Sequence, residues 1–582
     1  MSRDLTPPVI EVRNLNIAFG THEVVKNVDF QIRPSETLAV VGESGSGKSV
    51  TSMAVMGLLP STSSIKGSIK LDGREILGAS QETMRQMRGK VASMIFQEPM
   101  MSLNPVLRVG TQIEEALRQH MQIGSREATE EGIRLFDRVR IPDARRRFND
   151  YPHMFSGGMR QRIMIAIALS CSPKLLIADE PTTALDVTIQ AQILDLLNEV
   201  QRESGTSILF ITHDMGVVAN MADRVMVMRQ GRTVETGTVQ EIFKHPREDY
   251  TRMLIDAVPR LGHGTMLTRP ETKAADTPPP ILSVRNLVTR FDVHGGAFRR
   301  KVGRVHAVEG LSFDLQPGET LALVGESGCG KSTTGRSILY LNPPQSGEIV
   351  FAGRTVEPAS RKDLSNLRRN VQMIFQDPFS SLDPRQDIGS ALAEPLLCHG
   401  LATKAQAREK AEYLLGRVGL QASMIARLPH EFSGGQRQRI CIARALMLDP
   451  KVIVADEAVS SLDVSVKAQV VDLLLDLQEE LKLSYLFISH DMAIVERVSH
   501  RVAVMYLGEI VELGPTKEVL SQPQHSYTKK LMAAVPDPEP VADRHRRIGS
   551  PTTELPSPLR PLTYIPPARV SRTVGPDHIV ME

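Results

Sequence analysis

Residues 38–49 read LAVVGESGSGKS, and residues 321–332 read LALVGESGCGKS. In both stretches a short apolar run, of the length of a buried strand, ends in a glycine-rich loop with the pattern G-x-x-x-x-G-K-[ST]. The glycines allow successive backbone N–H groups to curl around phosphate oxygens at the positive end of the following helix. The closing lysine, Lys48 or Lys331, can reach the β- and γ-phosphates of a nucleotide, and the hydroxyl of Ser49 or Ser332 can hold Mg²⁺.

The predicted phosphate-binding loops extend slightly beyond these two residues. They comprise Gly42, Glu43, Ser44, Gly45, Ser46, Gly47, Lys48, Ser49 and Val50 in the first copy, and Gly325, Glu326, Ser327, Gly328, Cys329, Gly330, Lys331, Ser332 and Thr333 in the second.

The loop is one part of an internal repeat that covers most of the chain. The repeated positions are Lys48 and Lys331, Gln97 and Gln376, Ser156 and Ser433, Glu180 and Glu457, and His213 and His490. The last three pairs share an offset of 277, so the second part of each copy is collinear without gaps. We therefore expect a first domain over 1–259, a linker over 260–280, a second domain over 281–536 and a Pro-rich C-terminal tail over 537–582.

Each copy alternates apolar runs with helical patterns, which is typical of an α/β domain with a largely parallel sheet. Residues 175–178 and 452–455 are apolar runs that end in Asp-Glu, and residues 207–212 and 485–489 end in His-Asp. Ligands of open α/β sheets bind beyond the carboxyl ends of the strands, where all of these motifs stand.

Two further motifs fit a phosphate-handling site. Asp179 and Asp456 can orient Mg²⁺, and the following Glu180 and Glu457 can polarise an attacking water. Ser-Gly-Gly precedes a long helical pattern in each copy, which is a second design for anion binding at a helix N-terminus. These signature residues are Ser156, Gly157, Gly158 and Met159 in the first copy, and Ser433, Gly434, Gly435 and Gln436 in the second.

Composition excludes several other classes. The 582 residues carry a formal net charge of +2, without the basic excess of a nucleic-acid binder. The four cysteines show neither CxxC nor zinc spacing, which predicts isolated, reduced thiols. No signal peptide and no apolar run of about 20 residues is visible, so we expect a soluble or peripheral protein on the cytoplasmic side of a membrane.

The order of the motifs resembles that of ABC ATPases, and the resemblance covers nearly the whole chain. The set comprises the P-loop, the Gln loop, the Ser-Gly-Gly signature, the Asp-Glu strand, the Leu-Asp loop (Leu185-Asp186 and Leu462-Asp463) and the switch histidine. The resemblance implies two tandem P-loop NTPase domains, each a RecA-like core with an antiparallel β subdomain and a helical subdomain. It also implies a head-to-tail sandwich in which two ATP molecules lie between the P-loop of one half and the signature of the other.

The same resemblance implies roles for individual residues. Catalytic roles fall to Glu180, Glu457, His213, His490, Gln97 and Gln376, and Mg²⁺ contacts to Ser49, Gln97, Asp179, Ser332, Gln376 and Asp456. Asp186 and Asp463 would bridge the halves. Phe19 would stack on adenine in the first site, and Phe291 is the candidate in the second, where the insertion 294–303 obscures the alignment.

The subfamily is indicated by the Gln loops and by the end of each copy. The Gln loops read FQEPMMSLNP and FQDPFSSLDP, and the copies close with HPREDYTRMLIDAVP and QPQHSYTKKLMAAVP. These segments resemble the peptide/nickel importer group, and the fusion of two ATPases in one chain is most similar to its glutathione-importer branch. The expected partners are two permease subunits at the inner membrane and, indirectly, a periplasmic or extracellular substrate-binding protein, with no nucleic acid.

The chain departs from the family pattern in few places. Met159 stands where Gln is usual, and the absence of cysteines after Cys441 predicts no iron–sulfur cluster. The alternatives are a soluble twin ATPase that acts on ribosomes or DNA, the ATPase of a nickel importer, and an exporter ATPase. The short Pro-rich linker, the cysteine pattern and the importer-like closing segments disfavour the first and the last of these.

Overall fold

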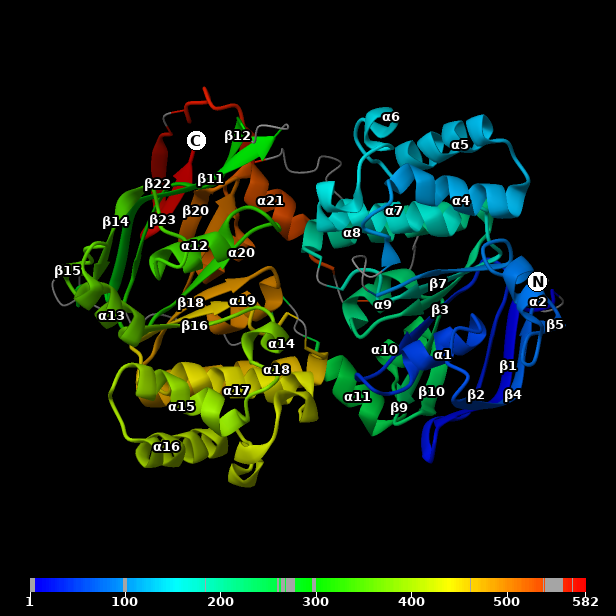
Figure 1. The fold of residues 1–582 in the computed structure, drawn as a ribbon, viewed down its shortest axis with the longest axis horizontal. Helices are drawn as coiled ribbons and strands as arrows, with labels where there is room; N and C mark the ends of the chain where they lie inside the picture. Colours follow the sequence, from blue (N-terminus) through cyan, green and yellow to red (C-terminus); the bar gives the residue numbers. More distant parts are fainter. Residues whose placement is uncertain are drawn as a thin grey trace.

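A computed structural model describes residues 6–97, 102–183, 185–258, 261–262, 267, 278–295, 300–460, 462–536, 539, 558–567 and 569–582. The described chain folds into two halves that lie side by side (Figure 1). No helix among these residues is both long and apolar enough to cross a membrane.

The first half contains an antiparallel sheet of order β2-β1-β4-β5 and a mainly parallel sheet of order β10-β9-β3-β8-β7-β6. Its strands are β1 (Ile10–Phe19), β2 (His22–Ile32), β3 (Thr37–Val41), β4 (Ser63–Leu71), β5 (Arg74–Glu75), β6 (Ala92–Ile95), β7 (Leu175–Asp179), β8 (Ser207–Ile211), β9 (Arg224–Arg229) and β10 (Arg232–Thr238). Its helices are α1 (Lys48–Val55), α2 (Gln81–Met87), α4 (Val109–Met121), α5 (Ser125–Arg138), α6 (Ala144–Arg147), η1 (Pro152–Met154), α7 (Gly157–Leu169), α8 (Val187–Ser204), α9 (Met215–Met221), α10 (Val239–Lys244) and α11 (Asp249–Asp256).

The second half repeats this plan with added strands, in sheets of order β15-β14-β11-β12-β21 and β16-β17-β18-β13-β19-β20-β23-β22. Its strands are β11 (Leu282–Gly295), β12 (Arg300–Leu315), β13 (Thr320–Val324), β14 (Ser346–Phe351), β15 (Arg354–Thr355), β16 (Val371–Ile374), β17 (Val452–Asp456), β18 (Ser484–Ser489), β19 (Arg501–Tyr506), β20 (Glu509–Pro515), β21 (Leu559–Arg560), β22 (Ser571–Gly575) and β23 (His578–Met581). Its helices are α12 (Lys331–Ile338), α13 (Arg361–Asn370), α14 (Pro378–Ser381), α15 (Ile388–Cys398), α16 (Lys404–Arg417), η3 (Ala422–Ala426), η4 (Pro429–Glu431), α17 (Gly434–Leu446), α18 (Val464–Leu481), α19 (Met492–Val498), α20 (Thr516–Ser521) and α21 (Ser526–Ala533).

The central strands are apolar on both faces because helices and the second sheet cover them. Every residue of β3, β7, β8, β13, β17 and β18 is buried, as expected for parallel strands inside an α/β layer. The strands β3 and β7 end directly before the P-loop and Glu180, which fixes both motifs at one edge of the sheet. The predicted α/β class with antiparallel and helical subdomains is confirmed.

The helical subdomains have their own apolar cores. In the first half Phe136 and Phe148 meet edge to face, with ring centroids 5.4 Å apart, and both belong to one buried cluster with α4, α5 and α7. The matching cluster of the second half joins α15, α16 and α17. In Figure 1 these helical layers lie at opposite corners of the molecule, α4–α7 at upper right and α15–α17 at lower left, so the halves are inverted relative to each other.

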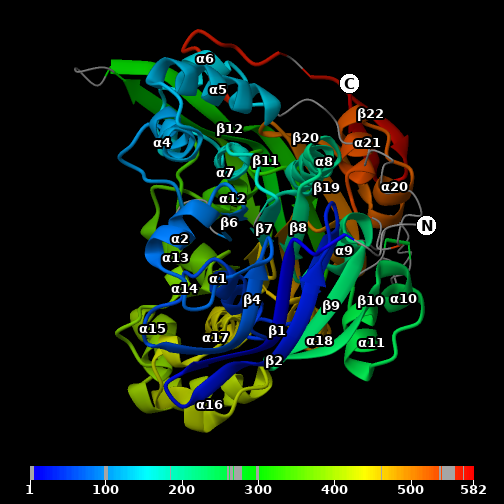
Figure 2. The same cartoon turned by 90° about the vertical axis from the view of Figure 1, so that its right-hand side faces the viewer.

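The segment predicted as a C-terminal tail contains strands that join the second half. Strand β21 pairs with β12, and β23 pairs with β20, so the sheet edges of the second half are extended (Figures 1 and 2). The anchor of β23 is His578, which is 4% exposed and lies 2.9 Å from the fully buried carboxylate of Glu512. Glu512 also accepts the backbone N–H groups of Gln524 and His525 at 2.9 Å each.

Replacing His578 with alanine should destabilise the second half. The substitution removes a buried partner of Glu512, but two backbone donors remain, so we expect a loss of about 1–3 kcal/mol. Calorimetry should show a lowered transition for the second half and an unchanged one for the first. His22→Ala, at an exposed position of the first half, is the control. Equal lowering of both transitions, or none, would contradict this account of the C-terminal segment.

Candidate functional site

The P-loops are tight turns that require glycine, at some positions because of a positive φ and at others because a side chain would clash. Gly45 and Gly47 have positive φ angles of 78° and 95°, and a Cβ on Gly42 would lie 2.1 Å from the carbonyl oxygen of Met228. Lys48 opens α1 and folds back to donate to the carbonyl oxygens of Gly42 and Glu43 at 2.8 and 2.9 Å. Burial lowers the pKa of Lys48, against the opposing effect of several nearby carboxylates.

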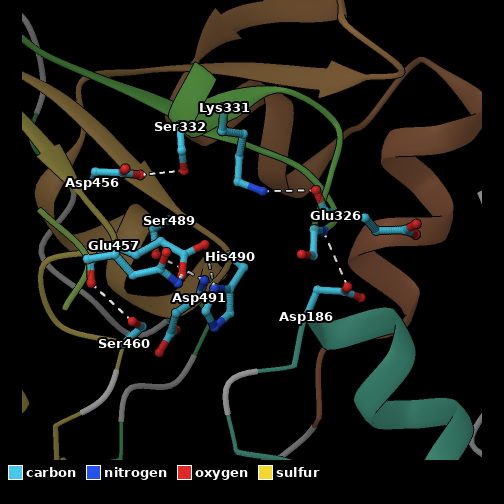
Figure 3. Close-up of polar contacts among 12 residues, drawn as sticks. Asp186, Glu326, Lys331, Ser332, Asp456, Glu457, Ser460, Ser489, His490 and Asp491 are labelled. Atoms are coloured by element: carbon cyan, nitrogen blue, oxygen red, sulfur yellow. Dashed lines mark hydrogen bonds and ion pairs between the residues drawn. The ribbon is translucent and has the colours of Figure 1, made fainter. Parts of the chain in front are cut away.

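The second P-loop repeats this geometry (Figure 3). Lys331 opens α12 and donates to the carbonyl oxygens of Gly325 and Glu326 at 2.7 and 2.9 Å. Val50 and Thr333 follow within the first turns of α1 and α12. In both loops backbone carbonyls of the loop hold the lysine ammonium. Phosphate oxygens of a nucleotide can take the place of these carbonyls as hydrogen-bond partners of the lysine.

A hydroxyl and a carboxylate meet beside each P-loop. Ser49 donates to Asp179 at 3.1 Å, and Ser332 donates to Asp456 at 2.7 Å. The second carboxylate oxygen of Asp456 is buried and has no hydrogen-bond partner within the described part of the chain. Mg²⁺ prefers oxygen ligands such as hydroxyls and carboxylates, so each of these pairs fits the metal ion of a Mg-nucleotide.

The adjacent glutamates each contact a glutamine and a histidine of the same half. Glu180 accepts hydrogen bonds from Gln97 and Thr183, both at 2.9 Å, and lies 3.2 Å from Nδ1 of His213. In the second half Gln376 donates to Glu457 at 2.6 Å, and Nδ1 of His490 lies 3.3 Å from it. The structure therefore brings the predicted Gln, Glu and His of each copy into direct contact.

Neighbouring carboxyls have opposite pKa shifts. Burial raises the pKa of Asp179 to about 6, and the charge of Glu180 adds to this rise. Burial also acts to raise the pKa of Glu180, but its hydrogen bond and charge interaction with His213 and its bond from Thr183 outweigh burial and lower it to about 2. The directions are the same for Asp456, raised by burial, and Glu457, lowered against burial by its contact with His490.

The pKa of His213 shifts in the opposite direction to that of its partner Glu180. Burial acts to lower the pKa of His213, but the hydrogen bond and the charge of Glu180 outweigh it and raise the pKa. The first site thus keeps an ionised glutamate and a histidine that readily carries a proton in contact with each other.

The signature serines cap their helices. Ser156 accepts the N–H of Met159 at 3.2 Å, and Ser433 accepts that of Gln436 at 3.4 Å. The side chain of Gln436 accepts the Ser433 N–H at 3.1 Å, which completes a capping box, whereas the sulfur of Met159 accepts from Arg147 at 3.5 Å. The difference between the two signatures is therefore one of helix capping within each half.

Close packing joins each signature to the helix that follows the Leu-Asp loop. A Cβ on Gly158 would lie 2.7 Å from Ile189 of α8, and a Cβ on Gly435 would lie 2.3 Å from Val466 of α18. A Cβ on Gly157 or Gly434, the first glycine of each signature, would meet no atom within 4 Å. The second glycine of each signature is thus required by packing.

Hydrogen bonds cross between the halves at both P-loops. The N–H of Ser44 donates to Asp463 at 3.1 Å, and the N–H of Ser327 donates to Asp186 at 3.3 Å. Ser465, at the start of α18, adds a donor to Glu43 at 2.8 Å. Figure 3 shows Asp186 entering from α8 of the first half toward Glu326 and Lys331 of the second. Each P-loop therefore faces the start of the other half's α8 or α18, and with it the signature packed on that helix.

The adenine-stacking candidates occupy related but unequal positions. Phe19 ends β1 and is partly buried against the first core, opposite His22. Phe291 lies within the longer hairpin β11–β12, pairs with Val305, and is 43% exposed.

Two tyrosines that contact the P-loops were not predicted from the sequence. The hydroxyl of Tyr250 accepts the N–H of Glu43 at 3.2 Å, and that of Tyr527 accepts the N–H of Glu326 at 3.0 Å. Both tyrosines stand in the closing segments of the two copies, where the shared Tyr-Thr pair was the available signal.

Comparisons with known proteins indicate the family of the chain. The model of the family described as ABC transporter matches residues 25–183 and 308–460. The model described as Oligopeptide/dipeptide transporter, C-terminal region, matches residues 234–280 and 511–559.

The chain is 54% identical over 604 residues to the Glutathione import ATP-binding protein GsiA of Escherichia coli strain K12, covering 99% of this chain and 97% of that protein. The protein of the same name from Pectobacterium atrosepticum is 51% identical over 601 residues, covering 98% and 96%. Among solved structures, a dimeric post-hydrolysis state of the ATP-binding cassette MJ0796 bound to ADP and Pi is 25% identical, with a TM-score of 0.36, and covers 40% of this chain and 98% of that one.

The raised pKa of Asp179 predicts a pH dependence of metal binding. Because this carboxyl is protonated below about pH 6 and a metal ligand must be ionised, the apparent Mg²⁺ affinity should fall as pH decreases below that value, by up to about tenfold per pH unit. The measurement is the Mg²⁺ requirement for ATP binding between pH 5 and pH 8 in Lys331→Ala, which disables the second P-loop. The same titration of Asp179→Asn in that background is the control, because the protonation of ATP is common to both proteins. Parallel profiles would refute the assignment.

Proposed function

Because the chain belongs to the ABC transporter family, as an ATPase with two cassettes, we propose that it binds two Mg-ATP between its halves and uses their hydrolysis to energise import of glutathione or short peptides. The observation that supports the paired sites is the reciprocal contact of each P-loop with the opposite half, through Asp463 and Asp186. The support for the cargo is the name shared by the similar full-length relatives and the match to the oligopeptide/dipeptide transporter region.

In this proposal each site is built from both halves. The first combines the Lys48 P-loop with the signature Ser433–Gln436, and the second combines the Lys331 P-loop with the signature Ser156–Met159. The lysine and the loop N–H groups hold the β- and γ-phosphates, and the signature serine with its helix N-terminus covers the γ-phosphate from the other side. ATP thereby joins the two halves.

Mg²⁺ would be held by Ser49, Asp179 and Gln97 in the first site and by Ser332, Asp456 and Gln376 in the second, and when bound it neutralises charge on the β- and γ-phosphates. Glu180 and Glu457 orient and polarise the attacking water. With a pKa near 2 the carboxylate of Glu180 is ionised at every physiological pH, so it acts on water by accepting a hydrogen bond. His213 and His490, which contact these glutamates through Nδ1, would donate an N–H from the other ring nitrogen to the γ-phosphate, where charge develops.

The catalytic glutamates are placed in a conformation that favours this task. Glu180 and Glu457 both have a positive φ of 47°, which non-glycine residues seldom adopt. In this conformation each glutamate side chain contacts the histidine that follows the neighbouring strand, β8 or β18.

We propose partners on the same basis. The chain supplies the ATPase, so two membrane permease subunits would hold it at the cytoplasmic face of the inner membrane, and a substrate-binding protein would deliver cargo to them. Gln97 and Gln376 donate to the two glutamates, and Leu103 and Leu382 of the same loops pack in the cores of the helical subdomains. These loops are therefore the proposed route by which a permease affects hydrolysis. Import is proposed over a role on ribosomes or DNA because the similar relatives are named as import proteins.

Substituting both glutamates with glutamine should separate ATP binding from hydrolysis. Glu180→Gln with Glu457→Gln keeps shape and hydrogen bonding but removes the charge that polarises water, so turnover should fall about 10²–10⁴-fold. ATP affinity should stay near that of the unsubstituted chain. The readouts are phosphate release and equilibrium ATP binding. Turnover close to that of the unsubstituted chain would remove both residues from the mechanism.

The cargo proposal is tested in the assembled importer. The chain is reconstituted in vesicles with its permeases, and ATPase activity is measured with binding protein loaded with glutathione, a dipeptide, an oligopeptide or Ni²⁺. We expect glutathione or a peptide to raise turnover well above that of the isolated chain, because the permease then positions the Gln loops. Stimulation by Ni²⁺ alone would transfer the proposal to nickel import, and stimulation by ribosomes or DNA would overturn import.

A further inference from the structure

We propose that strand β21 of the C-terminal segment is part of the second nucleotide site, where Leu559 widens the surface on which the purine base packs. This inference rests on the proposed binding of ATP at the Lys331 P-loop. The surface, here called the base platform, consists of Phe291, Val305 and Leu559, one residue from each of three neighbouring strands.

Strand pairing places the three side chains in a row. Phe291 of β11 is directly opposite Val305 of β12, and Val305 is directly opposite Leu559 of β21. Directly opposite residues of antiparallel strands project from the same face, about 4.5–5.5 Å apart at Cβ. A Cβ built on Gly303, two residues from Val305, would lie 2.9 Å from the Leu559 side chain, so Leu559 does project over this face.

The platform faces the P-loop helix. Thr289 lies two residues before Phe291 and therefore on the same face, and its hydroxyl is 2.9 Å from that of Ser337 in α12. The hairpin also touches the loop itself, because a Cβ on Gly330 would lie 1.9 Å from the carbonyl oxygen of Ala307. A nucleotide held by Lys331 thus has this apolar row beside its outer end.

The row is apolar and open, as a base-binding surface must be. Phe291 is 43% exposed and Leu559 is 44% exposed, while Val305 between them is half-buried. Aromatic and aliphatic side chains stabilise a purine ring that packs on them, chiefly through removal of apolar surface from water.

The segment that carries Leu559 is fixed from its other face. Pro558 accepts the backbone N–H of His306 at 3.0 Å, and the ring of Tyr564 meets that of His306 edge to face at 5.3 Å. The guanidinium of Arg560 lies 5.3 Å from the centre of the Tyr564 ring. These contacts hold β21 against β12 without using the platform face.

The first half lacks this arrangement among its described residues. There β2 is the outer strand of the sheet β2-β1-β4-β5, whereas in the second half β21 covers the corresponding edge of β12. Phe19 is opposite His22, a polar residue at the position where the second half has Val305. The two sites therefore differ in how they hold the base, while their P-loops are alike.

The test separates base contacts from phosphate contacts in one site at a time. Lys48→Ala leaves only the second site, and Lys331→Ala leaves only the first. In the Lys48→Ala background Leu559→Ala should weaken Mg-ATP binding about three- to tenfold, measured by calorimetry. Binding of inorganic tripolyphosphate, which has no base, should not change. In the Lys331→Ala background Leu559→Ala should change neither Mg-ATP binding nor tripolyphosphate binding.

The matched control is Leu562→Ala, which removes a 49% exposed leucine of the same segment outside the strand pairing, and which should leave both ligands unaffected. Unchanged ATP affinity at the second site, or an equal loss for ATP and tripolyphosphate, would overturn the inference while leaving the proposed ATPase function standing. If neither single-site variant binds ATP, the proposed function fails, and the inference fails with it.

Discussion

The structure depends on one interaction: each P-loop, at the end of a strand, is hydrogen-bonded to the Leu-Asp loop of the inverted second copy, so that each proposed nucleotide site is built from both halves. Asp186 shows how directly the two are joined. One oxygen of its carboxylate caps α8 by accepting the N–H of Ile189, and the other accepts the N–H of Ser327 in the opposite P-loop. Asp463 makes the reciprocal bond to Ser44. A movement between the halves therefore acts on both P-loops and on the helices that support the signatures.

The charges at each strand end are arranged so that two adjacent carboxyls behave differently. Asp179 is buried beside a hydroxyl and has a raised pKa, while Glu180 is surrounded by donors and has a lowered one. Opposite pKa shifts separate the tasks of neighbouring acids, and under the proposed function Asp179 would hold the metal and Glu180 would act on water. The same opposition of pKa shifts recurs at Asp456 and Glu457 in the second half.

The two halves are related but not equivalent. Arg229 lies over the ring of Tyr250, with 4.6 Å from its guanidinium carbon to the ring centre, whereas the second half has Tyr506 against Tyr527 with ring centroids 4.5 Å apart. Among the described residues, the strands beyond residue 557 join the second half, and the buried pair of His578 and Glu512 anchors β23 there. The corresponding Glu235 of the first half binds the N–H groups of Arg247 and Glu248. The contacts at the P-loops and at the Glu-His pairs are thus alike in the two halves, and the differences lie around them.

The sequence by itself determined the repeat, the α/β class, the strands that end at each motif, and the identity of the P-loop, Gln, Glu, Ser-Gly-Gly and His residues. It could do so because these features are local: a buried strand of five residues, a glycine turn and a helix cap are each written in consecutive positions. Only the tertiary structure decided that the Tyr250 and Tyr527 hydroxyls reach the P-loops, and that residues after 557 add strands to β12 and β20. Those contacts join residues separated by tens to hundreds of positions, and short polar or Pro-rich segments show no periodicity that would specify a partner. Their positions follow from which sheet edges and buried polar groups the folded core leaves to be satisfied.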